Sequence, residues 1–280
     1  MRELKKQNSA FLECKECNLK VGIMFTLNIN QDNVAFLNLD RPDLHNAFND
    51  ELIEKLIDEL KKLEKKSVRL LVLSGNGKSF CAGADLNWMK KMKDYSMEEN
   101  IQDSQKLCEL FTVLNQFSAP VIGRINGAAL GGGAGLVACC DYAIAVDSAM
   151  FGFTEVRLGL IPAVISPFVI AKIGESHARA YFLSGQRFNA ETAFKMGLIH
   201  SVVTEDKLDQ AMDNLIKEFL MAAPKASKSA KELVYQVVRK PTIEAARDYT
   251  CERIAVLRKG DEGQEGMSSL LEKRKANWLK

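Results

Sequence analysis

The chain has 280 residues, 47% of them hydrophobic and 26% charged, and its formal net charge at pH 7 is +2. This balance is typical of a globular protein with a sizeable core. Because opposite charges nearly cancel, composition gives no reason to expect a nucleic-acid or anionic membrane partner. The best apolar stretch, residues 161–170, contains two prolines and is shorter than the roughly 20 residues of a spanning helix, so we expect no membrane span.

The first 23 residues are polar and lack clear periodicity, so we interpret residues 1–23 as an N-terminal extension. They contain no apolar run of the kind found in signal peptides, which favours a cytoplasmic protein. The seven cysteines are an odd number without a disulfide framework, and this indicates reduced thiols. Cys14 and Cys17 form a C-x-x-C pair, but no second ligand pair follows at zinc spacing, so we expect no metal site.

Alternating apolar runs and helical patterns predict an α/β core. Val34–Leu39 is a β-like run that a turn with Pro42 ends. A helix then begins at Asn49 or Asp50, because leucines and isoleucines recur at helical spacing up to Leu63. Residues 68–73 are continuously apolar, as in a strand of a parallel sheet that is buried on both faces.

The next segments repeat this alternation and then give way to helices. We predict a helix over residues 97–117, a strand over 121–125, a helix opened by glycines 127–135, and a strand over 142–146. This order predicts right-handed crossover units. Beyond Ile165 we expect only helices, over residues 166–173, 177–183, 190–196, 207–222 and 227–238, and two more after Pro241.

Several familiar catalytic and nucleotide-binding motifs are absent. Gly77-Lys78-Ser79 resembles the end of a phosphate-binding loop, but Val72 stands where its first glycine belongs. The glycine run before Leu136 lacks the last small residue of a dinucleotide fingerprint, so we expect no nicotinamide cofactor. No G-x-S-x-G elbow is present, which disfavours a hydrolase.

Two glycine-containing turns could present backbone N–H groups to a ligand. Residues 79–86 follow a predicted buried strand, and residues 130–135 precede an apolar helix. Glycine lets a ligand approach the backbone closely, and a helix N-terminus adds partial positive charge. Together the turns could bind a developing oxyanion. The alternative is that these glycines only make tight turns and close packing.

Glu155 is an acid among apolar and aromatic neighbours in residues 151–162. Burial raises the pKa of such a carboxyl group, which suits a general acid or base near neutral pH. The alternative is a salt bridge from Glu155 to Arg157 or another cation.

These segments, in this order, resemble the enoyl-CoA hydratase/isomerase (crotonase) superfamily. The similarity runs from about Phe25 to the last helix, and the matching segments are Arg41-Pro42, Asn46-Ala47, residues 80–86, Asn126-Gly127, residues 131–133 and residues 151–162. It implies a crotonase-type spiral of ββα units over residues 24–205. It also implies a helical C-terminal trimerisation region over 206–280, which would form a homotrimer or a dimer of trimers.

The resemblance also implies roles for particular residues. The amides of Ala84 and Gly132 would form an oxyanion hole for a thioester oxygen, and Glu155 would move the proton. The backbone near five residues would bind coenzyme A: Asp43, Leu44, Ala82, Asp85 and Leu86. Coenzyme A would be part of the acyl-CoA substrate, so no separate cofactor is expected.

One position departs from the superfamily pattern. Gly135 stands where two-carboxylate hydratases have a second glutamate, and residues 163–167 replace a glycine-rich segment. The sequence here resembles bacterial methylglutaconyl-CoA hydratases of leucine breakdown. A lone glutamate fits a double-bond isomerase equally well. From another class, an RNA-binding protein would use lysines of the predicted helix over residues 50–66, but interspersed acids favour a solvated helix face.

Overall fold

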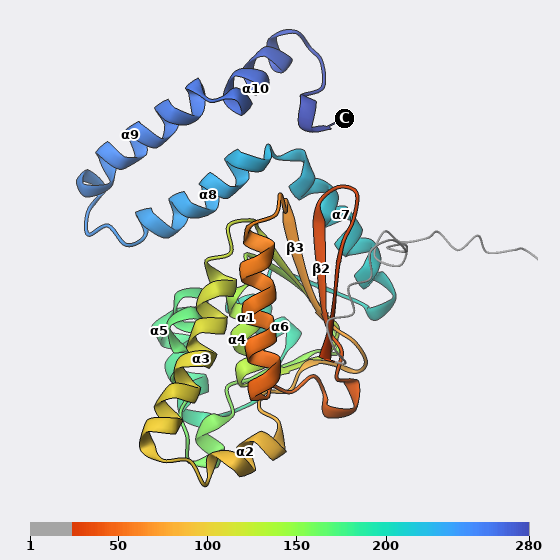
Figure 1. Cartoon of the computed structure of the whole chain (residues 1–280), viewed down its shortest axis with the longest axis vertical. Coiled ribbons are helices and arrows are strands. Elements are labelled where there is room, and N and C mark those ends of the chain that lie inside the picture. Colours follow the sequence, from red (N-terminus) through yellow and green to blue (C-terminus); the bar gives the residue numbers. More distant parts are fainter. Residues whose placement is uncertain (1–23, 280) are drawn as a thin grey trace, which may run out of the picture. The chain divides into compact units, whose positions relative to one another are not determined.

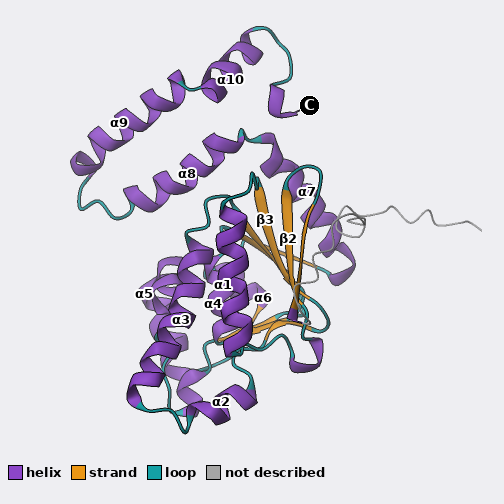
Figure 2. Ribbon diagram, in the orientation of Figure 1, coloured by secondary structure: helices purple, strands orange, loops and turns teal. Residues whose placement is uncertain are grey.

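The computed structural model describes residues 24–279 (Figures 1 and 2). The predicted N-terminal extension, with Cys14 and Cys17, lies outside these described residues. Within them, no helix combines the length and apolar character needed to cross a bilayer. No three His, Cys, Asp or Glu side chains of this part of the chain are grouped to hold a metal ion. Cys81, Cys139 and Cys140 are buried and form no disulfide within residues 24–279.

Two units make up the fold. Among the described residues, the first contains residues 24–117 and Val121–Asp213, and it holds both β-sheets. The second contains Ser118–Pro120 and the chain from Asn214 onward, and it is helical.

The larger sheet has the strand order β1-β2-β3-β5-β7-β10, and only the β1–β2 pair is antiparallel. Its strands are β1 (Phe25–Ile29), β2 (Val34–Leu39), β3 (Leu70–Gly75), β5 (Val121–Ile125), β7 (Tyr142–Val146) and β10 (Ser201–Val203). Every residue of β3 is buried, which confirms the parallel, two-sided strand expected from its apolar run.

A smaller sheet has the order β4-β6-β8-β9. Its strands are β4 (Ser79–Cys81), β6 (Ala128–Leu130), β8 (Met150–Gly152) and β9 (Phe188–Asn189). Three of them directly follow β3, β5 and β7, so each turn of the chain places one strand in each sheet before the next helix. This is the expected spiral of ββα units. The prediction of helices only beyond Ile165 was wrong, because β9 and β10 are too short to show a sequence period.

The helices match the sequence pattern closely. Asn49 caps α1 (Asp50–Glu64) by accepting the N–H of Leu52, and the apolar face of α1 is buried. α1 lies beside α3 (Met97–Asn115), as Figure 1 shows, and Lys61 pairs with Glu109 between them. The other helices are α2 (Leu86–Met92), α4 (Gly132–Cys139), α5 (Ser166–Ser184), α6 (Ala190–Lys195), α7 (Leu208–Met221), α8 (Pro224–Val237), α9 (Ile243–Lys259) and α10 (Asp261–Leu271).

Two features of the helices differ from expectation. α2 was not predicted, because a helix this short gives little periodic signal. The helix after the glycine run begins at Gly132, and β6 precedes it. The two helices expected over residues 166–173 and 177–183 are confirmed as the two helical stretches of α5, which meet at Gly174, whose φ of 72° is not helical.

The connection between the small sheet and α4 depends on close backbone packing. β4 and β6 pair in parallel, and α4 starts directly after β6. A Cβ on Gly133 would lie 2.0 Å from the carbonyl oxygen of Cys81 in β4. Because that neighbour is a strand backbone, it has little freedom to move away.

We therefore predict that Gly133→Ala lowers the free energy of unfolding by about 2 kcal/mol or more, because the added methyl overpacks a rigid contact. Denaturant unfolding measures the loss. Gly260→Ala is the control, since a Cβ there would meet its nearest atom at 3.5 Å, an ordinary contact. It should change stability by no more than about 1 kcal/mol. Equal losses in the two variants would contradict this account.

Candidate active site

The loop after β2 is joined to the turn after β4 by backbone hydrogen bonds. The N–H of Ala82 donates to His45 at 3.0 Å, the N–H of Phe48 donates to Gly83 at 2.7 Å, and the N–H of Asp85 donates to Phe48 at 2.7 Å. The two bonds of Phe48 flank Ala84. Peptide groups of an extended strand alternate in direction, so the N–H of Ala84 faces away from Phe48.

These bonds bring the residues expected to bind coenzyme A to one side of the unit. Asp43 and Leu44 belong to a short 3-10 turn, Pro42–Leu44, next to the bonded loop. Leu44 and Leu86 are exposed large apolar side chains. The two segments of the prediction, one around Leu44 and one from Ala82 to Leu86, are thus neighbours.

The side chain of Asp85 has a structural task. It forms a buried ion pair with Arg41 at 2.8 Å, and its other oxygen caps α2 by accepting the N–H of Asn87 at 2.8 Å. Burial acts to raise the pKa of Asp85, but the Asn87 N–H and the Arg41 guanidinium outweigh it and hold that pKa below its usual value. The carboxylate is therefore engaged, and so is the backbone of Asp85, whose N–H donates to Phe48 at 2.7 Å and whose carbonyl accepts the N–H of Met89 at 2.9 Å.

Asn46 is a scaffold residue whose role sequence reasoning missed. Its side chain is fully buried, and its Nδ2 donates to the carbonyls of Asn76 and Ser79 at 2.9 and 2.8 Å. Its Oδ1 accepts the N–H of Arg41 at 2.8 Å. The Arg41-Pro42 and Asn46-Ala47 pairs were noted only as matching segments. An arginine and an amide side chain can each bridge two loops by hydrogen bonds, and this property was the sequence signal for a structural role.

Three adjacent strands of the small sheet end at the candidate site. β4 pairs with β6 through Cys81 and Ala129, and β6 pairs with β8 through Leu130 and Gly152. Ala84, Gly132 and Glu155 each lie a few residues beyond the end of one of these strands. The sheet therefore brings together the turns that carry all three residues.

Close approaches between the turns support this arrangement. A Cβ on Gly83, beside Ala84, would lie 3.1 Å from the carbonyl oxygen of Leu130. Gly131 donates its N–H to Gly152 at 2.8 Å and has a φ of 51°, a conformation that favours glycine. Gly132 then opens α4, so its N–H is among the helical donors without an intrahelical partner.

Glu155 begins a short 3-10 turn after β8 and follows the fully buried Phe153. Its Oε1 lies 3.2 Å from the point that a Cβ on Gly131 would occupy. Its Oε2 is buried and has no hydrogen-bond partner among residues 24–279. Burial raises the pKa of Glu155, as its apolar neighbours predicted. This carboxyl group thus lies beside the glycine turn with one oxygen uncommitted.

The alternative salt bridge from Glu155 to Arg157 does not form within the described chain. The Arg157 side chain instead packs against Gly185 at the end of α5, where a Cβ would meet Arg157 at 3.0 Å. The two side chains leave the same turn in different directions.

Apolar side chains fill the space at Gly135. A Cβ there would lie 2.4 Å from Cγ2 of Ile165 and 3.0 Å from Cε1 of Phe111. The position that departs from the superfamily pattern therefore lacks room for any larger side chain. Glu155 is the acid that this arrangement leaves beside the glycine turn.

The histidines have supporting roles. Nδ1 of His45 lies 3.1 Å from Oγ of Ser79. His200 stacks on Tyr142, and its Nδ1 accepts the N–H of Ala143 at 3.1 Å. Burial lowers the pKa of His200, which keeps it neutral at physiological pH.

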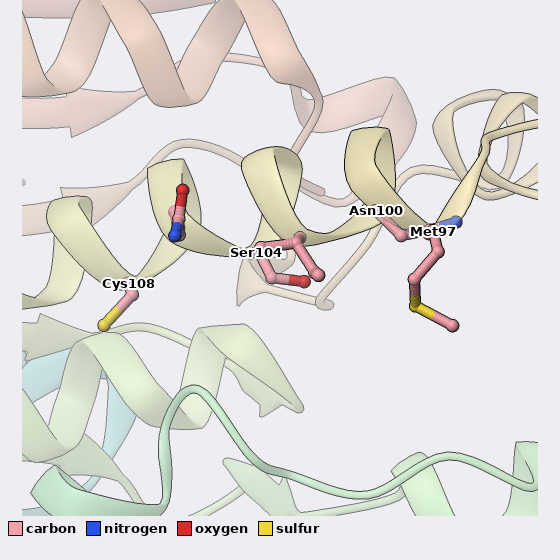
Figure 3. Close-up of a pocket in the computed structure, with 6 residues that line it drawn as sticks. Met97, Asn100, Ser104 and Cys108 are labelled. Carbon is pink, nitrogen blue, oxygen red and sulfur yellow. The ribbon is translucent and has the colours of Figure 1, made fainter.

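Two hollows lie outside this cluster. A shallow apolar pocket of about 380 Å³ runs along one face of α3, and Figure 3 shows Met97 and Cys108 projecting from that face. It is lined by Met97, Asn100, Ile101, Ser104, Gln105 and Cys108. A more polar pocket of about 630 Å³ lies where β3, β5 and β7 end, and includes Arg124 and Asp209.

Comparison with known proteins agrees with the fold. Residues 29–280 match the family described as Enoyl-CoA hydratase/isomerase. An enoyl-CoA hydratase from Shewanella pealeana is similar in structure, with a TM-score of 0.87 and 39% identity over 91% of this chain and 96% of that one. An enoyl-CoA hydratase/isomerase from Marinobacter aquaeolei has a TM-score of 0.86 and 31% identity over 92% and 99%. The 2,3-dehydroadipyl-CoA hydratase of Escherichia coli is 31% identical over 87% of this chain and 94% of that protein.

The buried carboxyl of Glu155 gives a stability prediction. Its folded-state pKa is raised above the ordinary value of 4.5, so the folded state holds the proton more tightly than the unfolded state. Stability is therefore lost as pH rises from the ordinary value through the folded pKa. Glu155→Gln removes the free-energy cost of burying an ionised carboxyl group. We therefore predict that the variant is more stable than the wild type near neutral pH.

Denaturant unfolding at about pH 7.5 and about pH 5 measures the effect, and the advantage of Glu155→Gln should shrink at the lower pH. Glu175→Gln is the matched control, because Glu175 is highly exposed on α5. A variant Glu155→Gln that is less stable than the wild type at neutral pH would contradict the burial cost.

Proposed function

Because the chain belongs to the enoyl-CoA hydratase/isomerase family, we propose that it adds water to the double bond of a 2-enoyl-CoA. The N–H groups of Ala84 and Gly132 bind the thioester oxygen, and Glu155 moves the proton. The observation that carries this proposal is the buried, unpartnered Oε2 of Glu155, with Oε1 beside Gly131. A carboxyl group held in this way has an unmet hydrogen-bonding capacity that a substrate or water can satisfy.

The two amides supply electrostatic stabilisation of an enolate. Attack at the β-carbon moves negative charge onto the thioester oxygen, so the amides bind the transition state more strongly than the substrate. In acyl-transfer sites, removal of one such donor typically costs about 3 kcal/mol. Gly132 adds the partial positive charge of the α4 N-terminus.

Glu155 supplies general base and acid catalysis. In its ionised form it accepts a proton from water while the water oxygen bonds to the β-carbon, and it then returns a proton to the α-carbon. Burial raises the pKa of Glu155 toward neutral pH, where both protonation states of the group are accessible. Burial of Glu155 limits access of bulk water to its carboxyl group.

The substrate's coenzyme A portion is placed along the neighbouring loops. The proposed contacts are the backbone near Asp43, Leu44, Ala82, Asp85 and Leu86. The ion pair of Arg41 and Asp85 supports this surface by holding the two loops in place. Because the two charged groups are paired with each other, they hold the loops that contact the ligand but offer it no net charge.

A double-bond isomerase is the second candidate, and Gly135 favours it. Ile165 and Phe111 exclude a second acid at this point, so Glu155 alone must manage the proton. A single carboxylate that shuttles one proton between two carbons needs no water. Hydration instead requires that groups other than a second acid hold the attacking water. The hydratases among the relatives support hydration as the first candidate.

For the acyl group we propose methylglutaconyl-CoA or a similar 2-enoyl-CoA of leucine or fatty-acid breakdown. The support is the likeness of residues 155–167 to methylglutaconyl-CoA hydratases. Ile165 of this segment packs against Gly135, the position that departs from the superfamily pattern.

We further propose a cytoplasmic enzyme that forms homotrimers or dimers of trimers through its helical region. Large apolar side chains are exposed on its helices and would be buried by such assembly. Val238, Ile243, Leu270 and Leu271 are each more than two-thirds exposed.

RNA binding has less support. Among the lysines of α1, Lys55 pairs with Glu51, Lys61 with Glu109 and Lys62 with Glu59. Acids thus offset much of the positive charge that would attract a phosphate backbone. Retention on RNA that falls steeply with salt would revive this candidate.

Incubation of enoyl-CoA substrates in heavy-oxygen water distinguishes the first two candidates. We predict that the label enters the product at the β-carbon, because water is the nucleophile. Mass spectrometry of the product, with crotonyl-CoA and methylglutaconyl-CoA as substrates, makes the measurement. A shifted double bond without label would assign the isomerase reaction instead.

We predict that Glu155→Gln lowers kcat by at least about 100-fold, because the amide cannot accept the proton. Acyl-CoA binding should remain, since the amides and the loops are unchanged. Activity of the wild type should also fall as pH drops through the raised pKa of Glu155, because the base becomes protonated. Glu175→Gln should retain activity, and full turnover by Glu155→Gln would remove Glu155 from the mechanism.

A further inference from the structure

We propose that Phe48 is a positioning residue that sets the spacing between the amides of Ala84 and Gly132. The inference rests on the proposed function, because it concerns how the two donors are held. Phe48 lies in the loop after β2, far in sequence from both turns. It contacts one of them through its backbone and the other through its ring.

The backbone of Phe48 fixes the turn that contains Ala84. Its N–H donates to Gly83 and its carbonyl accepts from Asp85, both at 2.7 Å, which makes a parallel bridge between Phe48 and Ala84. With both neighbours held, the peptide of Ala84 has little freedom to rotate. Its N–H direction is therefore set by where Phe48 lies.

The ring of Phe48 fixes the start of α4. A Cβ on Gly132 would lie 2.8 Å from Cε2 and 3.1 Å from Cδ2 of this ring, so the ring packs directly on the Gly132 backbone. Behind it, the ring of Phe111 meets Phe48 edge to face, with centroids 6.3 Å apart. Phe48 is 1% exposed, so the ring has no open space into which it could move.

One residue thus contacts both turns, the Ala84 turn through its backbone and the Gly132 turn through its ring. If both amides bind one oxygen, their spacing must be accurate, since small misplacements of catalytic groups cost large factors in rate. A phenyl ring has few torsions and a fixed width, so it is a suitable spacer. A flexible or shorter side chain at this position would let the distance between α4 and the Ala84 turn change.

Phe48→Leu tests the role of the ring, because leucine keeps an apolar side chain but lacks the ring atoms that touch Gly132. The main-chain bonds of residue 48 remain. We expect kcat to fall about 10- to 100-fold, with KM for acyl-CoA changed less than about threefold. The carbonyl stretch of a bound saturated acyl-CoA, measured by infrared difference spectroscopy, should move back toward its value in solution because the hydrogen bonds weaken.

Phe36→Leu is the matched control, since Phe36 is a buried phenylalanine of β2, a strand that carries none of the proposed site residues. It loses the same atoms from the same unit, and we expect its kcat to stay within about threefold of the wild type once folded protein is counted. Equal kcat values for the two variants, or a loss in Phe48→Leu that appears only in KM, would overturn the proposal.

A double-mutant cycle tests the contact itself. Gly132→Ala keeps the N–H but pushes its methyl group into the Phe48 ring, so we expect it to lower kcat strongly. Combining it with Phe48→Leu frees the space, and the double variant should lose much less than the product of the two single losses. Losses that simply multiply would mean that Phe48 does not act through Gly132.

The outcomes separate this proposal from the proposed reaction. If the wild type turns over no enoyl-CoA, the reaction is wrong, and the carbonyl stretch of bound acyl-CoA still reports whether Phe48 governs the two donors. If the wild type is active but Phe48→Leu leaves both kcat and the carbonyl stretch unchanged, the reaction stands and the positioning role fails.

Discussion

Parallel pairing of β4, β6 and β8 is the constraint on which the candidate site depends. This small sheet ends with three adjacent turns, which carry Ala84, Gly132 and Glu155. The close backbone approach of Gly133 to β4 lets α4 begin directly where β6 stops. No side chain could take that place without moving one of two main chains. The geometry of the donors is therefore a property of the sheet rather than of flexible loops.

The small sheet has polar contacts on the side of Ala84 and apolar packing on the side of Gly135. The loops beside Ala84 are fixed by polar contacts: the Arg41 and Asp85 ion pair, and the buried amide of Asn46. The far side, near Gly135, is sealed by Ile165 and Phe111. Glu155 lies beside Gly131, with its pKa raised by burial. A thioester would thus meet oriented N–H groups at its oxygen and a poorly solvated acid near its carbons.

Sequence patterns predicted the long elements well. The leucine spacing and the Asn49 cap located α1, and apolar runs located β5 and β7. The strands β4, β6 and β8 were not predicted, because three residues are too few to show the alternation of a strand. Their sequences are typical of turns. The burial of Glu155 followed from its local neighbours. The contacts of Phe48 did not, because they join residues distant in sequence and depend on how the spiral closes.

The central claim is that two main-chain donors from separate turns converge on one oxygen beside Glu155. A crystal structure with a saturated, unreactive acyl-CoA tests this most directly. The account predicts the thioester oxygen about 3 Å from the nitrogens of both Ala84 and Gly132, with the Glu155 carboxyl group facing the α- and β-carbons. A thioester oxygen bound by only one of these amides, or a Glu155 carboxyl group turned away from the acyl chain, would contradict it.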